Sequence, residues 1–281
     1  MLYIPARGNT ILGENVGAAS AEFGTTVTGA AAHVKNTTYA TLIAAITYDS
    51  FGITIMLAGT ADTASINTRM LVDIAIGAAA AEKVIIPNLM VGNVGVFGGV
   101  AYGNCQMYYF PIFIPKGSRL SATAQSLIVN DTCTCAVWLH QGPSARDRWM
   151  GSRVTSYGAN LVTSSGVSHS PGNGTYATDT EIIAACTYPI KAMQIGYDLL
   201  TDTTATNSRG LVRIGVGATP NYVISDLPFN ESTTVESVSI AYGNFILGQM
   251  RFNIAAATRL TVSAQRSVSA EARGWIIYGV D

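Results

Sequence analysis

Apolar and polar residues alternate along several short stretches of this chain. In residues 69–77 apolar side chains fall at every second position, and residues 209–217 repeat the arrangement. Residues 118–125 and 258–265 form a second matched pair. A period of two places successive side chains on opposite faces of a β-strand. The pattern therefore predicts antiparallel sheets with one buried face and one polar face.

The matched stretches are separated by a constant distance. Arg69 and Arg209 stand at the same place in Asn-Thr-Arg-Met-Leu-Val and Asn-Ser-Arg-Gly-Leu-Val, an offset of 140 residues (209 − 69). The same offset joins Arg119 to Arg259, and each of these begins an alternating stretch that ends in Gln. The sequence thus predicts a tandem duplication of one unit. Features kept in both copies are expected to serve the shared fold, whereas differences are the better candidates for function.

Turn-forming Gly, Pro, Asn and Asp separate further short stretches of the same kind. The predicted fold is all-β, with two tandem antiparallel β-sandwiches, jelly-roll-like and related by internal duplication. Further strands of the first unit, each with a counterpart in the second, are predicted at 41–48, 53–58, 83–86, 108–114 and 134–140.

The last predicted strands set the boundary between the units. Matching Trp138 to Trp275, an offset of 137 (275 − 138), ends the first unit near residue 142. Both tryptophans lie on apolar strands and are expected in the cores. The predicted parts are, in chain order, an extended N-terminal arm (1–22), the first sandwich (23–142), a linker (143–157) and the second sandwich (158–281).

Charge is scarce along the chain. Charged residues make up 12% and hydrophobic residues 48%, whereas about 25% charged is usual. Disordered chains are rich in charge and poor in apolar residues, so a folded protein with an uncharged surface is predicted. Such a surface suits burial against neighbouring proteins. The formal net charge of −1 and the lack of an 18-residue apolar run predict neither a nucleic-acid partner nor a membrane span.

Groups suited to catalysis or metal binding are few and isolated. His33, His140 and His169 have no nucleophile motif or visible partner, so they are interpreted as polar loop or strand-edge residues. Cys133 and Cys135 alternate along a strand without further ligands at zinc spacing, and the cysteines are interpreted as small buried hydrophobes. No catalytic residue, metal or cofactor is predicted, and the protein is expected not to be an enzyme. A polysaccharide depolymerase is the weakest alternative, since a carboxylate pair cannot be recognised from sequence.

Two duplicated positions suit either structure or sugar binding. Asp62 and Asp202 lie in Thr-rich stretches that are expected to form loops. Each either forms an Asx turn with its own backbone or binds calcium or a sugar. Tyr102 and Tyr242, in Ala-Tyr-Gly-Asn, are either corner aromatics or platforms for a sugar ring. Duplication favours the structural interpretation, and the four residues are the glycan-contact candidates of an alternative function.

The copies differ most clearly in the linker. Arg146, Arg148 and Arg153 surround Trp149, and this cluster occurs once. Because Arg and Trp are enriched at interface anchors, the cluster, with Arg7 of the arm, is predicted to contact a partner. An ordinary solvated linker is the competing interpretation.

One matched position changes its charge. Asp73 of the first unit corresponds to Arg213 of the second, at the same offset of 140 (213 − 73). A reversal of charge at a matched position predicts a solvated or interface face.

Three segments of the first unit, residues 71–77, 85–89 and 109–120, resemble a family of accessory virion proteins of tailed bacteriophages. The resemblance covers most of the first unit and weakens in the second, where Pro111 becomes Arg251. The resembling segments are strand, turn and strand, and they carry no catalytic residue. The resemblance implies a component of a phage particle, located in the virion after assembly in the host cytoplasm.

The expected function is therefore a non-enzymatic structural component of a bacteriophage particle, which decorates or bridges capsid, neck or tail proteins through uncharged β-sandwich surfaces. Its expected partners are other virion proteins and copies of itself, in closed cyclic symmetry with a trimer as the working expectation. The alternative is a receptor- or glycan-binding module of a tail fibre or spike, because sandwiches present binding loops at their ends.

Overall fold

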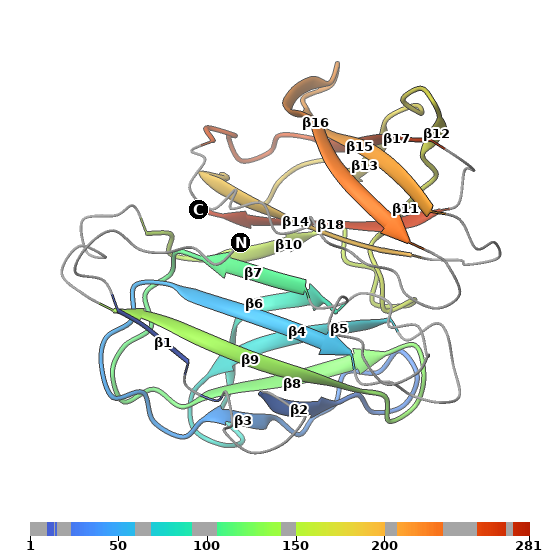
Figure 1. The fold of residues 1–281 in the computed structure, drawn as a ribbon. Coiled ribbons are helices and arrows are strands. Elements are labelled where there is room, and N and C mark those ends of the chain that lie inside the picture. The colour runs from blue at the N-terminus through green and yellow to red at the C-terminus, as the bar shows by residue number, and fades with distance from the viewer. Residues whose placement is uncertain are drawn as a thin grey trace.

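The computed structural model describes residues 10–13, 15, 24–59, 69–91, 106–141, 150–199, 207–232, 252–267 and 272–281 (Figure 1). Over these residues the chain forms strands and turns without a helix, so no helix there has the length and apolarity to cross a membrane. Four sheets form two sandwich-like halves, which confirms the predicted fold class.

The first half packs two sheets face to face. One has the strand order β1-β9-β4-β7, with β2 also paired to β9, and the other has the order β3-β8-β5-β6. Its strands are β1 (Thr10–Gly13), β2 (Thr25–Thr28), β3 (Ala40–Ile43), β4 (Ile53–Gly59), β5 (Met70–Ile76), β6 (Lys83–Met90), β7 (Gln106–Phe110), β8 (Leu120–Ser126) and β9 (Thr132–Gln141).

The second half repeats this plan. One sheet has the order β10-β18-β11, with β14 on β18, and the other has the order β12-β17-β15-β16, with β13 on β17. Strand β12 runs parallel to β17, and the other pairings are antiparallel. Its strands are β10 (Val154–Tyr157), β11 (Val167–His169), β12 (Gly172–Asn173), β13 (Thr180–Ile183), β14 (Ala192–Leu199), β15 (Asn207–Val216), β16 (Asn221–Ser232), β17 (Leu260–Arg266) and β18 (Arg273–Val280).

The register of the last strands corrects the predicted match between the tryptophans. Ile55 pairs with Val137 and Ile195 pairs with Ile277, so β9 and β18 correspond with an offset of 140 (277 − 137). Trp138 therefore corresponds to Tyr278, and the match to Trp275 was wrong. Offsets of 137 and 140 differ by an odd number, which turns a side chain to the other face of the strand. Trp275 lies in the core at 1% exposure, whereas Trp138 is half-buried on the outer face.

Two predicted connections contain strands. Val154–Tyr157, placed in the linker, forms β10 and pairs with β18. Thr10–Gly13, placed in the arm, forms β1 and pairs with β9. Asn15 continues this edge, because its Nδ2 donates to the carbonyl of Cys135 at 2.7 Å and its Oδ1 accepts from the Val137 N–H at 2.8 Å. Short edge strands of this kind have no room for an alternating pattern, so the sequence did not reveal them.

The second half completes the core of the first. Strands β6 and β7 are the edges of the two first-half sheets, and the sheet with β10, β14 and β18 lies beside them (Figure 1). Tyr278 and Ile276 of β18 belong to the same buried cluster as Tyr108 and Phe110 of β7. The Tyr278 ring lies edge-on to Tyr108, with 5.3 Å between centroids. One face of the sheet around β18 therefore belongs to the core of the first half, whereas its other face packs into a separate core of the second half.

Candidate functional site

The two halves carry corresponding sites on the outer faces of the sheets β3-β8-β5-β6 and β12-β17-β15-β16. In the first half the site is occupied by a loop of the second half. We call the occupied one the filled site (His33, Leu71, Met90 and Gln125) and the loop between β10 and β11 the docking loop (158–166). The site in the second half is the open pocket, lined among others by Gly174, Arg209, Leu211, Pro228, Gln265 and Arg266.

Hydrogen bonds hold the docking loop in the filled site. Gln125 Nε2 donates to the carbonyl of Leu161 at 2.8 Å and to Ser164 Oγ at 3.1 Å. His33 Nδ1 lies 3.0 Å from the same hydroxyl. Beside Gln125, Leu71 is 0% exposed and Met90 is 1% exposed. The part of this face around Gln125 is thus buried, with the docking loop bonded to it.

The shape of the docking loop comes from bonds within the loop. Asn160 and Ser165 exchange two backbone hydrogen bonds, at 2.7 and 3.1 Å. The Val162 N–H donates to Asn160 Oδ1 at 3.1 Å. Ser164 has a φ of 50°, in the left-handed region. Local bonding of this kind preorganises the loop before it contacts its partner surface.

The open pocket is the filled site rebuilt in the second half. Leu211 pairs with Gln265 and Pro228, as Leu71 pairs with Gln125 and Met90. The Gly174 N–H donates to the Arg266 carbonyl at 2.7 Å, and the His33 N–H donates to the Ser126 carbonyl at the same distance. The corresponding apolar side chains are nevertheless uncovered: Leu211 is half-buried and Pro228 is exposed.

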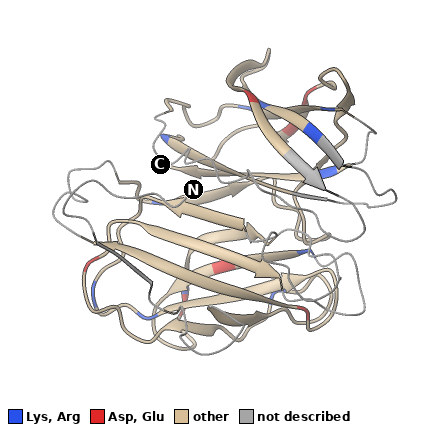
Figure 2. Cartoon of the chain, viewed as in Figure 1, with Lys and Arg blue, Asp and Glu red and all other residues tan. Residues whose placement is uncertain are grey.

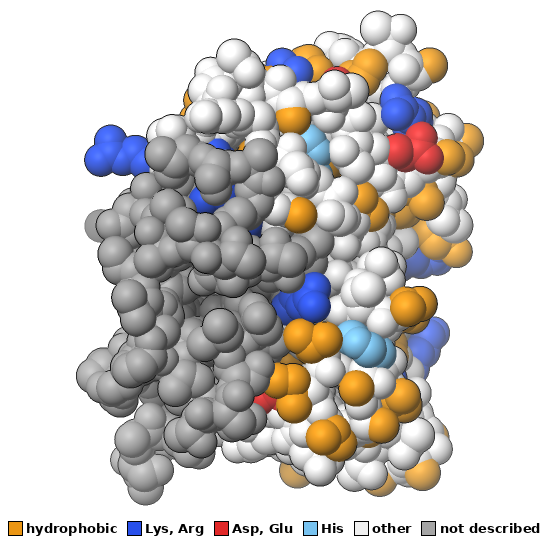
Figure 3. All heavy atoms as spheres, turned by 90° about the vertical axis from the view of Figure 1, so that its right-hand side faces the viewer, with side chains coloured by type: hydrophobic (Ala, Val, Ile, Leu, Met, Phe, Trp, Pro, Cys, Tyr) orange, Lys and Arg blue, Asp and Glu red, His pale blue; other side chains and the backbone are white. Residues whose placement is uncertain are grey.

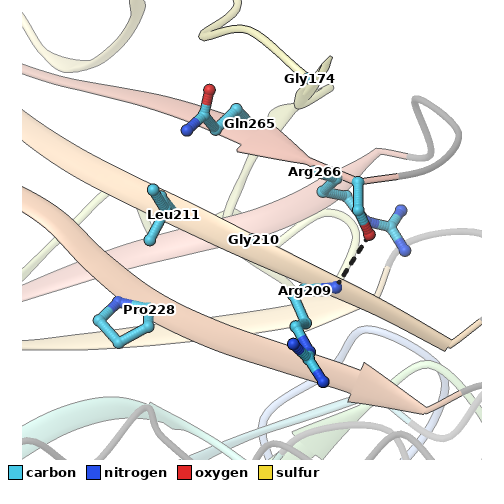
Figure 4. A pocket seen from close by; sticks show the side chains of 8 residues that line it. Gly174, Arg209, Gly210, Leu211, Pro228, Gln265 and Arg266 are labelled. Carbon is cyan, nitrogen blue, oxygen red and sulfur yellow. Dashed lines mark hydrogen bonds between the residues drawn. The ribbon is translucent and has the colours of Figure 1, made fainter.

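Two arginines, Arg209 and Arg266, lie at one end of the open pocket, with Leu211 and Pro228 farther along the strands (Figure 4). Arg266 is buried and Arg209 is exposed, and none of the lining side chains is acidic. In the first half, the residue at the position that corresponds to Arg266 is Ser126. Arg209 is therefore the charged side chain that this cavity, about 360 Å³ in volume, presents to solvent.

Farther along β15, Arg213 lies between two aromatic rings. Its Cζ is 4.1 Å from the centroid of Tyr176 and 4.0 Å from that of Tyr222. The Tyr176 hydroxyl donates to Asp226 Oδ1 at 2.6 Å, and the Tyr222 hydroxyl donates to Asp179 Oδ2 at 2.8 Å. Desolvation, together with Asp226, raises the pKa of Tyr176 to about 12. Cation–π contacts of this kind hold the guanidinium without a direct ion pair.

The corresponding place in the first half holds an ion pair. Lys35 Nζ lies 2.8 Å from Asp73 Oδ1, which also accepts the Asn88 N–H at 2.7 Å. Burial lowers the pKa of Lys35, and the nearby Asp73 carboxylate acts in the opposite direction. Asp73 is only 8% exposed, so the reversal to Arg213 is accommodated by new partners rather than by solvent. The solvated face offered as one explanation was wrong for Asp73.

Two histidines are more deeply buried than the sequence indicated. His140 Nε2 lies 2.8 Å from Thr54 Oγ1, and burial lowers the pKa of His140 to about 4. His169 Nε2 accepts the Ala264 N–H at 3.1 Å, and burial also lowers the pKa of His169. Neither histidine is a loop residue: both are buried on strands, His140 on the inner strand β9 and His169 on β11 at the edge of its sheet, as the strand-edge interpretation had it. His33 lies in a turn and contacts the docking loop, as described above.

The cysteines are small buried hydrophobes, as predicted, at the three described positions. Cys133, Cys135 and Cys186 are free and buried. Burial raises the pKa of Cys135 to about 12 and that of Cys186 to about 11. Across the described ranges, His, Cys, Asp and Glu form no group of three that could hold a metal ion.

Of the predicted site residues, Arg153 alone lies within the described part. It is exposed, and its Cζ lies 3.7 Å from the centroid of the Tyr188 ring. The predictions for the others remain predictions, because these residues lie outside the described ranges: Arg7, Asp62, Tyr102, Arg146, Arg148, Trp149, Asp202 and Tyr242.

Sequence reasoning missed the residues that define the filled site and the open pocket. Gln125 and Gln265 end the matched alternating stretches, so their duplication was visible. The next residue differs between the copies, with Ser126 in the first and Arg266 in the second. That difference, placed directly after a conserved stretch of the duplication, was the available signal.

Comparisons with known proteins identify no family. No family model and no curated protein matches the chain. Among solved structures, the chain is similar to PNGF-II, with a TM-score of 0.33 and 10% identity over 97% of this chain and 66% of that one. It is also similar to tripeptidyl peptidase 2 (TPP II), with a TM-score of 0.28 and 6% identity over 98% of this chain and 23% of that one. Similarities this distant indicate neither a family nor an activity.

Proposed function

We propose that the protein is a non-enzymatic structural component of a bacteriophage particle, decorating or bridging capsid, neck or tail proteins. The supporting observation is how the two halves bind each other. Gln194 Nε2 donates to the Tyr109 carbonyl at 2.7 Å, and Gln106 Nε2 donates to the Tyr197 carbonyl at 3.1 Å. The described contacts between the halves are neutral hydrogen bonds and packed rings.

A surface of this kind suits repeated burial against other proteins. Neutral amides and hydroxyls that find partners are cheaper to desolvate than charges. Most of the described ribbon carries no charged residue (Figure 2), and the face in Figure 3 shows mainly neutral and apolar side chains among its described residues. The sequence resemblance of the first half to accessory virion proteins points to the same role, with location in the virion.

Incorporation into particles tests the proposal. Deleting residues 1–22 would also remove β1 and Asn15, which complete a sheet, so the sharper deletion is residues 1–9, including Arg7. We expect the shortened protein to fold and to be depleted from purified virions, measured by quantitative mass spectrometry. Normal incorporation would show that the arm is not a contact, and absence of the full-length protein from virions would overturn the proposed function.

A receptor- or glycan-binding module is the second candidate. Tyr176 and Tyr222, each bonded to an aspartate, bring aromatic rings and carboxylates together on one outer sheet face, a combination suited to sugars. A glycan array with the full chain tests it. Reproducible binding that Tyr176→Ala abolishes would favour this candidate over the structural role, and an array without binding would remove it.

A further inference from the structure

We propose that mild acid loosens strand β11 and releases the docking loop from the filled site, through protonation of His169. The inference goes beyond the proposed function and does not depend on it. It rests on the hydrogen bonds of the buried imidazole, on the position of β11 next to the docking loop, and on a difference between the two halves.

The hydrogen bonds of His169 require a neutral ring. A backbone N–H can only donate, so the Ala264 N–H at 3.1 Å fixes Nε2 as an acceptor without a proton. The proton of the neutral ring therefore lies on Nδ1, which donates to Thr180 Oγ1 at 2.8 Å. A second proton on Nε2 would place two donors against each other at a residue that is 3% exposed. Protonation must therefore move the ring or its strand.

The ring of His169 joins the two sheets of the second half. His169 lies on β11, in the sheet of β18, whereas Ala264 of β17 and Thr180 of β13 belong to the facing sheet. Strand β11 is three residues long and lies at the edge of its sheet. An edge strand this short makes few ladder bonds of its own, so the bonds of His169 are important for its position.

Strand β11 anchors the docking loop. The loop ends at Gly166, and β11 begins at the next residue, Val167. Ser164, whose hydroxyl accepts from Gln125 in the filled site, precedes His169 by five residues (169 − 164). A displacement of β11 is therefore transmitted directly to the part of the loop that is bonded to the first half.

The first half holds apolar side chains at the places of this polar contact. Val27 and His169 pair with residues 133 and 273, and Ala40 and Thr180 pair with residues 122 and 262. Both correspondences keep the offset of 140 (273 − 133 and 262 − 122). Val27 is 1% exposed and belongs to the core of the first half. The shared fold thus forms without a histidine here, and the group that titrates is particular to the second half.

The strands beside β11 already carry two buried cations. Arg273 of β18 is the cross-strand partner of His169. Arg266 of β17 lies two residues beyond Ala264. The two arginines are 0% and 1% exposed, respectively. A protonated His169 would therefore be a third buried positive charge in this part of the second half.

Asp179 is the acidic group that acts in the opposite direction. It lies directly before β13, and its carboxylate favours the protonated ring. Glu181 on β13 is exposed and lies 2.7 Å from Arg259. Burial is the larger effect and lowers the pKa of His169 from its ordinary 6.5. The unfolded segment therefore takes up the proton first, so the contribution of His169 to stability is complete above about pH 6.5 and is lost as pH falls below that value.

Native-state hydrogen exchange of the full chain, resolved by mass spectrometry, tests the proposal. After correction for the intrinsic exchange rate, we expect the protection of residues 158–169 to fall by up to about tenfold between about pH 7.5 and about pH 5.5, because one pH unit below an ordinary pKa is a factor of ten in protonation. Residues 24–28, which include Val27, are the internal comparison and should keep their protection.

His169→Gln is the test variant, because a glutamine amide offers an acceptor to Ala264 and a donor to Thr180 but does not titrate. We expect the acid response of residues 158–169 to disappear. If this variant does not fold, His169→Val combined with Thr180→Ala rebuilds the pair of the first half and makes the same test.

His33→Asn is the matched control. His33 also contacts the docking loop, but its partner is the Ser164 hydroxyl, which can donate or accept and so tolerates either protonation state. Asparagine suits the left-handed backbone of this position, whose φ is 59°. We expect this control to respond to acid as the unchanged chain does. Equal protection of residues 158–169 at both pH values, a response that survives His169→Gln, or one that His33→Asn abolishes would overturn the inference.

Discussion

At the scale of single residues, one backbone position accepts opposite charges when its neighbours change with it. Asp73 pairs with Lys35, whereas Arg213 lies between Tyr176 and Tyr222. Lys35 and Tyr176 occupy corresponding turns before β3 and β13, so both members of the contact changed. The exchange visible in the sequence was therefore half of a coupled pair, and its partner could not be recognised without the fold.

Asp73→Arg alone is expected to destabilise the first half. The substitution removes the counter-charge of the mostly buried Lys35 and places two cations together. We expect it to lower the free energy of unfolding by about 3 kcal/mol. Adding Lys35→Tyr should recover part of this loss by restoring the second-half arrangement. Urea unfolding of both variants measures the difference, and equal stability of the single and double variants would contradict the coupling.

His140 is expected to make the protein less stable in mild acid. Its pKa is about 4 in the folded state against an ordinary 6.5, so the unfolded chain takes up the proton first as pH falls. Its contribution is complete above pH 6.5 and is lost toward pH 4, by up to about 3 kcal/mol. His140→Gln should flatten the pH dependence of the free energy of unfolding in this window. An unchanged slope would show that other groups dominate.

At the scale of elements, alternation predicted the long central strands and their partners. Strands β5, β8, β15 and β17 each turn one apolar face to the core, and this imposes the period of two, although β5, β8 and β17 are buried on both faces. The last strand was misaligned because two tryptophans were matched by identity, although register is set by the neighbouring strand. Strands β1 and β10 were missed, since four residues at a sheet edge are too few to show a pattern.

The loop that ends at Gly166 is expected to tolerate no side chain there. An added Cβ would lie 2.3 Å from the backbone nitrogen of Trp275, so Gly166→Ala must displace β18. We expect a loss of about 2–3 kcal/mol, measured by thermal or urea unfolding. Gly117→Ala is the control: it has a φ of 83° and open space, so it carries only backbone strain of about 1–2 kcal/mol. A smaller loss for Gly166→Ala than for the control would contradict the contact.

At the scale of the whole molecule, the halves are joined by a shared interior rather than by the linker alone. The repeat was readable from the sequence, but the filled site was not. Its two sides, Gln125 and the docking loop, meet only after the second half has docked, and the loop has no sequence pattern of its own. Whether a duplicated surface is covered or open depends on this docking.

Tyr278→Phe is expected to destabilise both halves together. The Tyr278 hydroxyl accepts the Met90 N–H at 2.9 Å and donates to the Asn88 carbonyl at 2.9 Å. Leaving the Met90 N–H and the Asn88 carbonyl buried without this hydrogen-bond partner should lower the free energy of unfolding by about 1–3 kcal/mol. Calorimetry should show one transition at a lower temperature. Two transitions, of which only one moves, would contradict the shared core.

The shared core also constrains the timing of synthesis. Strand β18 begins at Arg273, about 130 residues after β9 ends at Gln141. At about 5–20 residues added per second, the newly made first half waits roughly ten seconds for the strand that covers Tyr108 and Phe110. Until then these rings are unprotected on a nascent chain. Completion of the first half therefore depends on the late emergence of β18 from the ribosome, and a pause in translation between β9 and β18 would favour aggregation.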